Sequence, residues 1–150
     1  MRRNSFTNGA NFRQKPGIDR GPAPCTVNVP QAARQNTAFR TALWTGCHLQ
    51  MTLMCIPPCG EIGPEIHPDT DQCIRVEEGQ CNVLTGCSRE GLEVQRCLAA
   101  GDAVFVPAGI WHNIVNTGRY PLKLSSVYAP PHHPRGTVQL TRQDAERSGY

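Results

Sequence analysis

Short apolar segments separated by turn-forming residues are the sequence feature that most constrains this fold. Between about Asn36 and Pro131, runs of about five to nine residues alternate with Gly, Pro or Asp. The segments that we interpret as extended are FRTALW, HLQMTLMCIPP, EIGPEIH, DQCIRVEEG, QCNVLTG, LEVQRCLAAGD, AVFVPAG, WHNIVNTG and PLKLSSVYAPP. This spacing predicts an all-β domain, an antiparallel sandwich or barrel with little long helix.

The length fits a single folded domain. A chain of 150 residues with 39% hydrophobic content can build one core, but it is short for two. Residues 1–24 are polar and rich in Gly, Asn, Arg and Pro, so we expect a flexible N-terminal arm there. Residues 25–150 are then the folded domain, with the core of the barrel at about 36–131.

The two ends of this domain carry weaker signals. A first extended segment is expected at Cys25–Val29, followed by a helical turn that leads into the strand near Phe39–Trp44. Near the other end, Thr141 is a candidate N-cap with Asp144 in the first turn. This pattern predicts a short C-terminal helix or a polar tail.

Charge and hydropathy exclude some classes of partner. The net charge of +3 is modest and the basic residues are scattered, so we expect no nucleic-acid partner. The first twenty residues lean basic, and we interpret them as a solvated arm. The N-terminus lacks the apolar stretch of a secretion signal, and no run of about 18 apolar residues could span a bilayer. We therefore expect a soluble, cytoplasmic protein without a membrane partner.

The chain has eight cysteines, enough for disulfides or a zinc site, but the size of the domain and the spacing of the cysteines favour neither. A domain of this size needs no disulfide framework, and no pair shows the two-residue spacing of a zinc knuckle. Free, mostly buried thiols are the expectation.

Four polar side chains form the candidate site. On a strand, residues two apart share a face, so Glu65 and His67 point the same way. Gln72 opens the next strand across a tight turn, and His112 would arrive from a strand further along. The alternative is a buried, hydrogen-bonded histidine with Glu65 and Gln72 at the surface. Asp69 and Asp71 suit a solvated turn better than the ligand face.

The spacing of these residues resembles the two motifs of the cupin family. Its second motif matches Gly101, Pro107, Gly109, His112 and Asn116. Its first motif, read back from Gly79, is met in part: Gln72 stands at the glutamate position, His67 at the second histidine and Glu65 at the first. Cys59 stands at the opening glycine, and Gly60 follows it directly. The resemblance runs from about Asn36 to Glu146. Over this range the sequence is similar to a bacterial cupin subgroup labelled mannose-6-phosphate isomerase-like.

This resemblance implies a conical jelly-roll barrel in which Glu65, His67, Gln72 and His112 converge on one divalent metal per chain. The donors are two imidazoles, one carboxylate and one amide oxygen, a set compatible with iron, manganese, zinc, nickel or copper. Glu65 could double as a catalytic base. Pro107, Gly109 and Asn116 would shape the turn and the strand end around His112.

The wall of the barrel and its rim are predicted from strand alternation and from position along the chain. We expect an apolar inner wall, Arg75 and Trp111 facing away from it, and Lys123 on an undetermined face. Tyr128, His132, His133 and Arg135 lie where the chain leaves the barrel, as a rim or as a solvated loop. The predicted wall residues are Met51, Leu53, Ile74, Val76, Phe105 and Ile114.

Three functions are compatible with these features. The first is a metal-dependent enzyme of small-molecule metabolism, of the isomerase, dioxygenase or lyase class. The second is a non-catalytic module that holds a metal or a small ligand, and the third is a structural cupin without metal. A sugar-phosphate isomerase is disfavoured because only Lys123 offers an ammonium within the barrel. A homodimer is expected, with residues 25–44 lending a strand across the interface.

Overall fold

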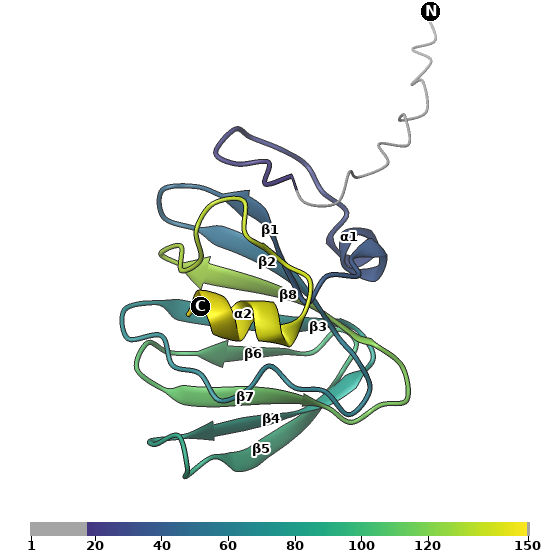
Figure 1. Ribbon diagram of the computed structural model, residues 1–150, viewed down its shortest axis with the longest axis vertical. Helices are drawn as coiled ribbons and strands as arrows, with labels where there is room; N and C mark the ends of the chain where they lie inside the picture. Colours follow the sequence, from purple (N-terminus) through teal and green to yellow (C-terminus); the bar gives the residue numbers. More distant parts are fainter. Residues whose placement is uncertain (1–17, 150) are drawn as a thin grey trace, which may run out of the picture.

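The computed structural model describes residues 18–149, which form two antiparallel sheets and two short helices (Figure 1). The arm that we expect at residues 1–24 therefore lies mostly outside the described residues. The elements in chain order are α1 (Val29–Gln35), β1 (Arg40–Thr45), β2 (Gln50–Ile56), β3 (Asp71–Glu78), β4 (Gln80–Gly86), β5 (Glu93–Ala99), β6 (Ala103–Val106), β7 (Trp111–Asn116), β8 (Leu122–Ala129), β9 (Val138–Gln139) and α2 (Arg142–Ser148).

The strands pair across long sequence distances, as a jelly roll requires. The larger sheet has the order β6-β3-β8-β2-β1-β9, and the smaller sheet has the order β5-β4-β7. All the strand pairs are antiparallel. The prediction of an all-β antiparallel barrel is confirmed.

Alternation along the strands explains where the core lies. In β3, Ile74 and Val76 are buried while Arg75 between them is exposed, the period of two that a half-buried strand shows. Residues from both sheets form one apolar cluster, which includes Met54, Ile56, Val83, Ile114 and Leu124. Each such side chain contributes about 1.5–3 kcal/mol by leaving water.

A second, smaller apolar cluster attaches α1 to the larger sheet. Ala32 and Ala33 of the helix pack with Leu43 and Leu53, and Met51 lies against them. Because Met51 and Leu53 alternate with the barrel-facing residues of β2, they belong to this outer cluster. Their prediction as inner-wall residues is wrong.

Phe105 is the third incorrect wall residue. It is 78% exposed, while Val104 and Val106 on either side of it face the core. The register explains this, since Val104 pairs with Ile74 and Val106 pairs with Gln72. A strand of four residues is too short for its pattern to identify the buried face.

Two expected strands are not regular. Cys25–Val29 forms no strand, and α1 begins at Val29 with the Asn28 side chain accepting a hydrogen bond from Gln31 N. The segment 61–67 makes only isolated bridges, Glu61 to Val115 and Glu65 to His112. Gly63, with φ of 98°, and Pro64 interrupt it, because neither continues a ladder.

The C-terminal helix is confirmed. Thr141 accepts a hydrogen bond from Asp144 N, and the Asp144 side chain accepts one from Thr141 N, so a capping box starts α2.

The cysteines match the prediction only in part. All eight lie within residues 18–149 and are free thiols. The expectation that most are buried is wrong, because only Cys81 is buried and five are exposed. Several stand in turns between strands, such as Cys47, Cys59 and Cys87, where no core is available to cover them.

Candidate metal centre

Glu65 and His112 face each other across a pair of backbone hydrogen bonds. Glu65 N donates to His112 O and His112 N donates to Glu65 O, each at 2.9 Å. Residues paired in this way project side chains on the same side of the ladder. The Glu65 carboxylate therefore reaches the imidazole, with 3.4 Å between Glu65 Oε1 and His112 Nε2.

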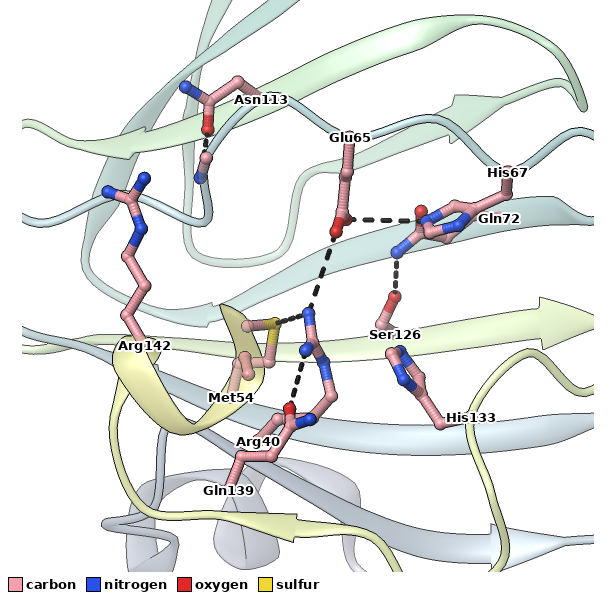
Figure 2. Close-up of polar contacts among 12 residues, drawn as sticks. Arg40, Met54, Glu65, His67, Gln72, Asn113, Ser126, His133, Gln139 and Arg142 are labelled. Carbon is pink, nitrogen blue, oxygen red and sulfur yellow. Dashed lines mark hydrogen bonds and ion pairs between the residues drawn. The ribbon is translucent and has the colours of Figure 1, made fainter. Parts of the chain in front are cut away.

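His67 completes a group of three ligand atoms, as Figure 2 shows in part. Its Nε2 atom lies 3.5 Å from Glu65 Oε1, and the ligand atoms of Glu65, His67 and His112 all lie within 4.8 Å of one another. Both histidines are buried, whereas the Glu65 side chain is 18% exposed. The structure thus brings together three of the four residues that the sequence predicts.

The ring of His112 is oriented by a local contact. Its Nδ1 atom lies 3.0 Å from the carbonyl oxygen of Ile110, which places the Nδ1 proton toward that carbonyl. Nε2 is then the atom with a lone pair, and it points at Glu65. This is the tautomer in which a histidine binds a metal through Nε2.

Gln72 enters the same interior from β3. Its Nε2 donates to Ser126 Oγ at 2.8 Å, which fixes the amide and leaves Oε1 on the other side (Figure 2). Tyr128, directly opposite Gln72 in the ladder, has its ring centroid 5.5 Å from that of His67. Gln72 therefore lies in the neighbourhood of the histidines.

The four predicted ligand atoms share one property. Glu65 Oε1, His67 Nε2, Gln72 Oε1 and His112 Nε2 are all buried without a hydrogen-bond partner among the described residues. Buried polar atoms are costly when unpaired and are almost always satisfied. A divalent cation held by these atoms would satisfy all four, so the residues fit a metal.

Arg40 lies next to the site, and the sequence analysis did not predict it. It is 1% exposed, and its Nη2 atom lies 3.9 Å from Glu65 Oε2, while Nη1 donates to Gln139 Oε1 at 2.8 Å (Figure 2). Burial raises the pKa of Glu65, but the adjacent imidazoles of His112 and His67 and the charge of Arg40 together outweigh it. The net effect holds the pKa of Glu65 well below its usual range, so the carboxylate stays ionised.

Tyr128, His132 and His133 form an aromatic wall on another side of His67. The ring centroids of His67 and His132 are 4.1 Å apart, and His133 Nε2 lies 3.2 Å from the Tyr128 hydroxyl. Burial lowers the pKa of His132 to about 4 and that of His133 to about 2. Tyr128 and His133 are buried, so the solvated-loop interpretation is wrong for them, whereas Arg135 is exposed.

The remaining predicted residues lie away from the ligand atoms. Arg75 faces outward and pairs with Glu77, and Lys123 Nζ donates to Asn36 O on the side of the sheet covered by α1. Asp69 is exposed, and the Asp71 carboxylate accepts a hydrogen bond from Ala108 N. These contacts give none of them a place at the centre.

Comparison with known proteins agrees with this geometry. The family model described as cupin domain matches residues 52–128, and the chain belongs to the cupin family. The uncharacterised protein YrkC of Bacillus subtilis (strain 168) is 53% identical over 127 residues, which are 85% of this chain and 68% of YrkC.

A solved structure extends the likeness to three dimensions. The crystal structure of BH2720 from Bacillus halodurans has a TM-score of 0.84 and 50% sequence identity, and covers 87% of this chain and 98% of its own. Neither protein's name states an activity. Within residues 18–149, no helix combines the length and the apolar character needed to cross a membrane.

Proposed function

We propose that this cupin is a divalent-metal-dependent enzyme of small-molecule metabolism that acts through Glu65, His67, Gln72 and His112. One observation carries the proposal: four donor atoms of the types that bind transition metals are buried in one interior without hydrogen-bond partners among the described residues. Polar atoms in that state favour a bound cation over a merely structural barrel.

The donor set restricts the chemistry. Two imidazoles and one carboxylate are also the ligands of mononuclear iron oxygenases, and Gln72 would add a weaker neutral oxygen. The metal would supply Lewis-acid or redox chemistry, and iron, manganese, zinc, nickel and copper are all compatible with these donors. Glu65, ionised and partly exposed, would hold the metal on the side that a ligand can approach, and a role for it as a base is part of the proposal.

The alternatives use the same residues. A non-catalytic module that senses or holds a metal or a small ligand would have a closed coordination shell. An activity like that of the mannose-6-phosphate isomerase-like subgroup would need cations that face the substrate phosphate. Lys123, the cation considered for that role, is engaged with Asn36 O.

The state of the coordination shell separates an enzyme from a closed binder. We expect protein reconstituted with cobalt(II) to change its visible absorption spectrum when azide is added, because an enzyme site keeps a position open for substrate. The measurement is a titration to one azide per cobalt, with His112→Ala as the control. An intense four-coordinate spectrum that azide leaves unchanged would favour the binding module instead.

We also propose a cytoplasmic homodimer. The exposed Phe105 lines an apolar groove on the outer face of the larger sheet, together with Cys73 and Val127 of the neighbouring strands. Large exposed apolar patches commonly mark protein interfaces. Within the chain, β1 already pairs with β2 and β9, so the outer face is a better candidate than strand lending. A monomer in light scattering at micromolar concentration would contradict the dimer.

A further inference from the structure

Ser126 of β8 lies beside Gln72 on the inner face of the larger sheet. In the ladder between β3 and β8, Tyr128 stands opposite Gln72. Ser126 precedes Tyr128 by two residues, so it faces the same side and is a diagonal neighbour of Gln72. Gln72 Nε2 donates a hydrogen bond of 2.8 Å to Ser126 Oγ (Figure 2). Both residues are buried, at 3% and 1% exposure, so this contact is shielded from solvent.

The two ends of the Gln72 amide differ in what they offer a cation. The oxygen accepts, whereas the NH₂ group only donates. Gln72 Oε1 is buried without a hydrogen-bond partner among the described residues, so its lone pairs are available to a metal. When the oxygen faces a metal, the NH₂ group needs an acceptor of its own, because an unpaired buried donor is costly. Ser126 Oγ is the acceptor that the structure provides.

The reversed orientation of the amide would oppose metal binding. A serine hydroxyl can also donate, so with the amide turned over Ser126 would donate to Gln72 Oε1. The NH₂ group would then take the position of the oxygen and repel a cation there. A glutamate has two equivalent oxygens and presents no such choice. Metal binding at Gln72 therefore selects the orientation in which Ser126 accepts, and without Ser126 that orientation leaves the NH₂ group unpaired.

We infer that Ser126 is the positioning residue that makes Gln72 bind the metal through its oxygen. This inference rests on the proposed function and adds to the four ligands a residue that acts through one of them. Partners of this kind orient metal ligands and tune metal affinity. The adjacent Ser125 cannot take the role, because it faces the opposite side of β8 and donates to Glu77 Oε1 at 2.6 Å.

The test measures the affinity for cobalt(II) by competition with a chelator, which requires no substrate. We expect Ser126→Ala to weaken cobalt binding about ten-fold, because the amide that faces the metal then has an unpaired NH₂ group. Ser125→Ala is the matched control, since it removes a buried serine hydroxyl from the other face of the same strand. It should change the affinity by less than about two-fold.

Double-mutant cycles show whether Ser126 acts through Gln72. In the Gln72→Ala variant, which lacks the amide, adding Ser126→Ala should weaken cobalt binding by less than about two-fold. In the Gln72→Glu variant, Ser126→Ala should cost less than about three-fold, because either carboxylate oxygen can face the metal. A serine that only supported the barrel would weaken binding about equally in every background.

The outcomes separate this inference from the proposed function. If the wild type binds cobalt, and Ser126→Ala either binds it equally well or weakens it equally in every background, the inference is overturned and the metal centre stands. Wild-type affinity in Gln72→Ala would also overturn it, because Gln72 would then not be a ligand. A wild type that binds no cobalt would overturn both. Should Ser126→Ala not fold, the similarly shaped Ser126→Cys decides: its thiol is a weak acceptor, so we expect a loss of at least about five-fold, and wild-type affinity would contradict the inference.

Discussion

Replacing His112 by alanine is expected to reduce the metal content of anaerobically purified protein from about one transition metal per chain to none. The imidazole Nε2 lies 3.4 Å from Glu65 Oε1 and is one of the four buried, unpaired donor atoms. His67→Ala should have the same effect, because each variant leaves a single imidazole. Gln72→Ala should retain metal with about 10–100-fold weaker affinity, as expected when a weak or supporting donor is lost. Elemental analysis and metal competition titrations measure both effects.

His48→Ala is the matched control for these variants. His48 is an exposed histidine in the turn between β1 and β2, so its removal should leave the metal content at about one per chain. If the wild-type protein contained no metal after purification and bound none on reconstitution, the metal-centre proposal would be wrong. Equal metal content in the His112 and His48 variants would show that His112 is not a ligand.

The site residues could be predicted from the sequence where local geometry places them. Glu65 and His67 are two residues apart, and the motif from Gly101 to Asn116 spans one turn and one strand, so sequence spacing decides which way these side chains point. The regular strands were recognisable for the same reason, because turn residues separate them.

Arg40 could not be found in this way. Its place beside Glu65 depends on the pairing of β1 with β2, where Arg40 stands opposite Met54 and a bulge interrupts the register between Ala42 and Trp44. A bulge shifts the faces of a strand, and no spacing rule within β1 reveals it. The inward position of a charged residue is nevertheless a signal, because a buried arginine in a barrel needs a functional or structural anion.

The packing of Tyr128, His132 and His133 against His67 could not be predicted, for a different reason. His132 and His133 follow β8 in a loop, and the direction of that loop is set by contacts with a distant strand. Gln50 Oε1 of β2 accepts hydrogen bonds from the backbone N–H groups of both histidines, at 3.2 Å and 2.9 Å. Such a contact over more than eighty residues is a property of the folded barrel. Sequence reasoning could only place these residues near its rim.

Asn116→Ala separates the structural part of the motif from its metal-binding part. We expect the free energy of unfolding to fall by about 2–4 kcal/mol while the metal content stays at about one per chain. Asn116 is buried, and its Nδ2 donates to the carbonyls of Ile56, Pro57 and Tyr120 at 3.0–3.1 Å. Its Oδ1 accepts from Gly118 N at 2.8 Å. Each buried group left unpaired costs about 1–3 kcal/mol, and water entering at the strand end recovers part of that cost.

Denaturant unfolding of the metal-loaded protein measures this loss, which corresponds to a melting temperature lower by about 5–10 °C. Asn82→Ala is the control, since Asn82 is half-buried on the neighbouring strand β4 and its side chain accepts a hydrogen bond from the exposed Cys97 thiol. It should cost less than about 1 kcal/mol. If Asn116→Ala instead lost its metal at unchanged stability, the last residue of the motif would act on the centre itself. The division of labour between His112 as a ligand and Asn116 as the clamp of the strand end would then be wrong.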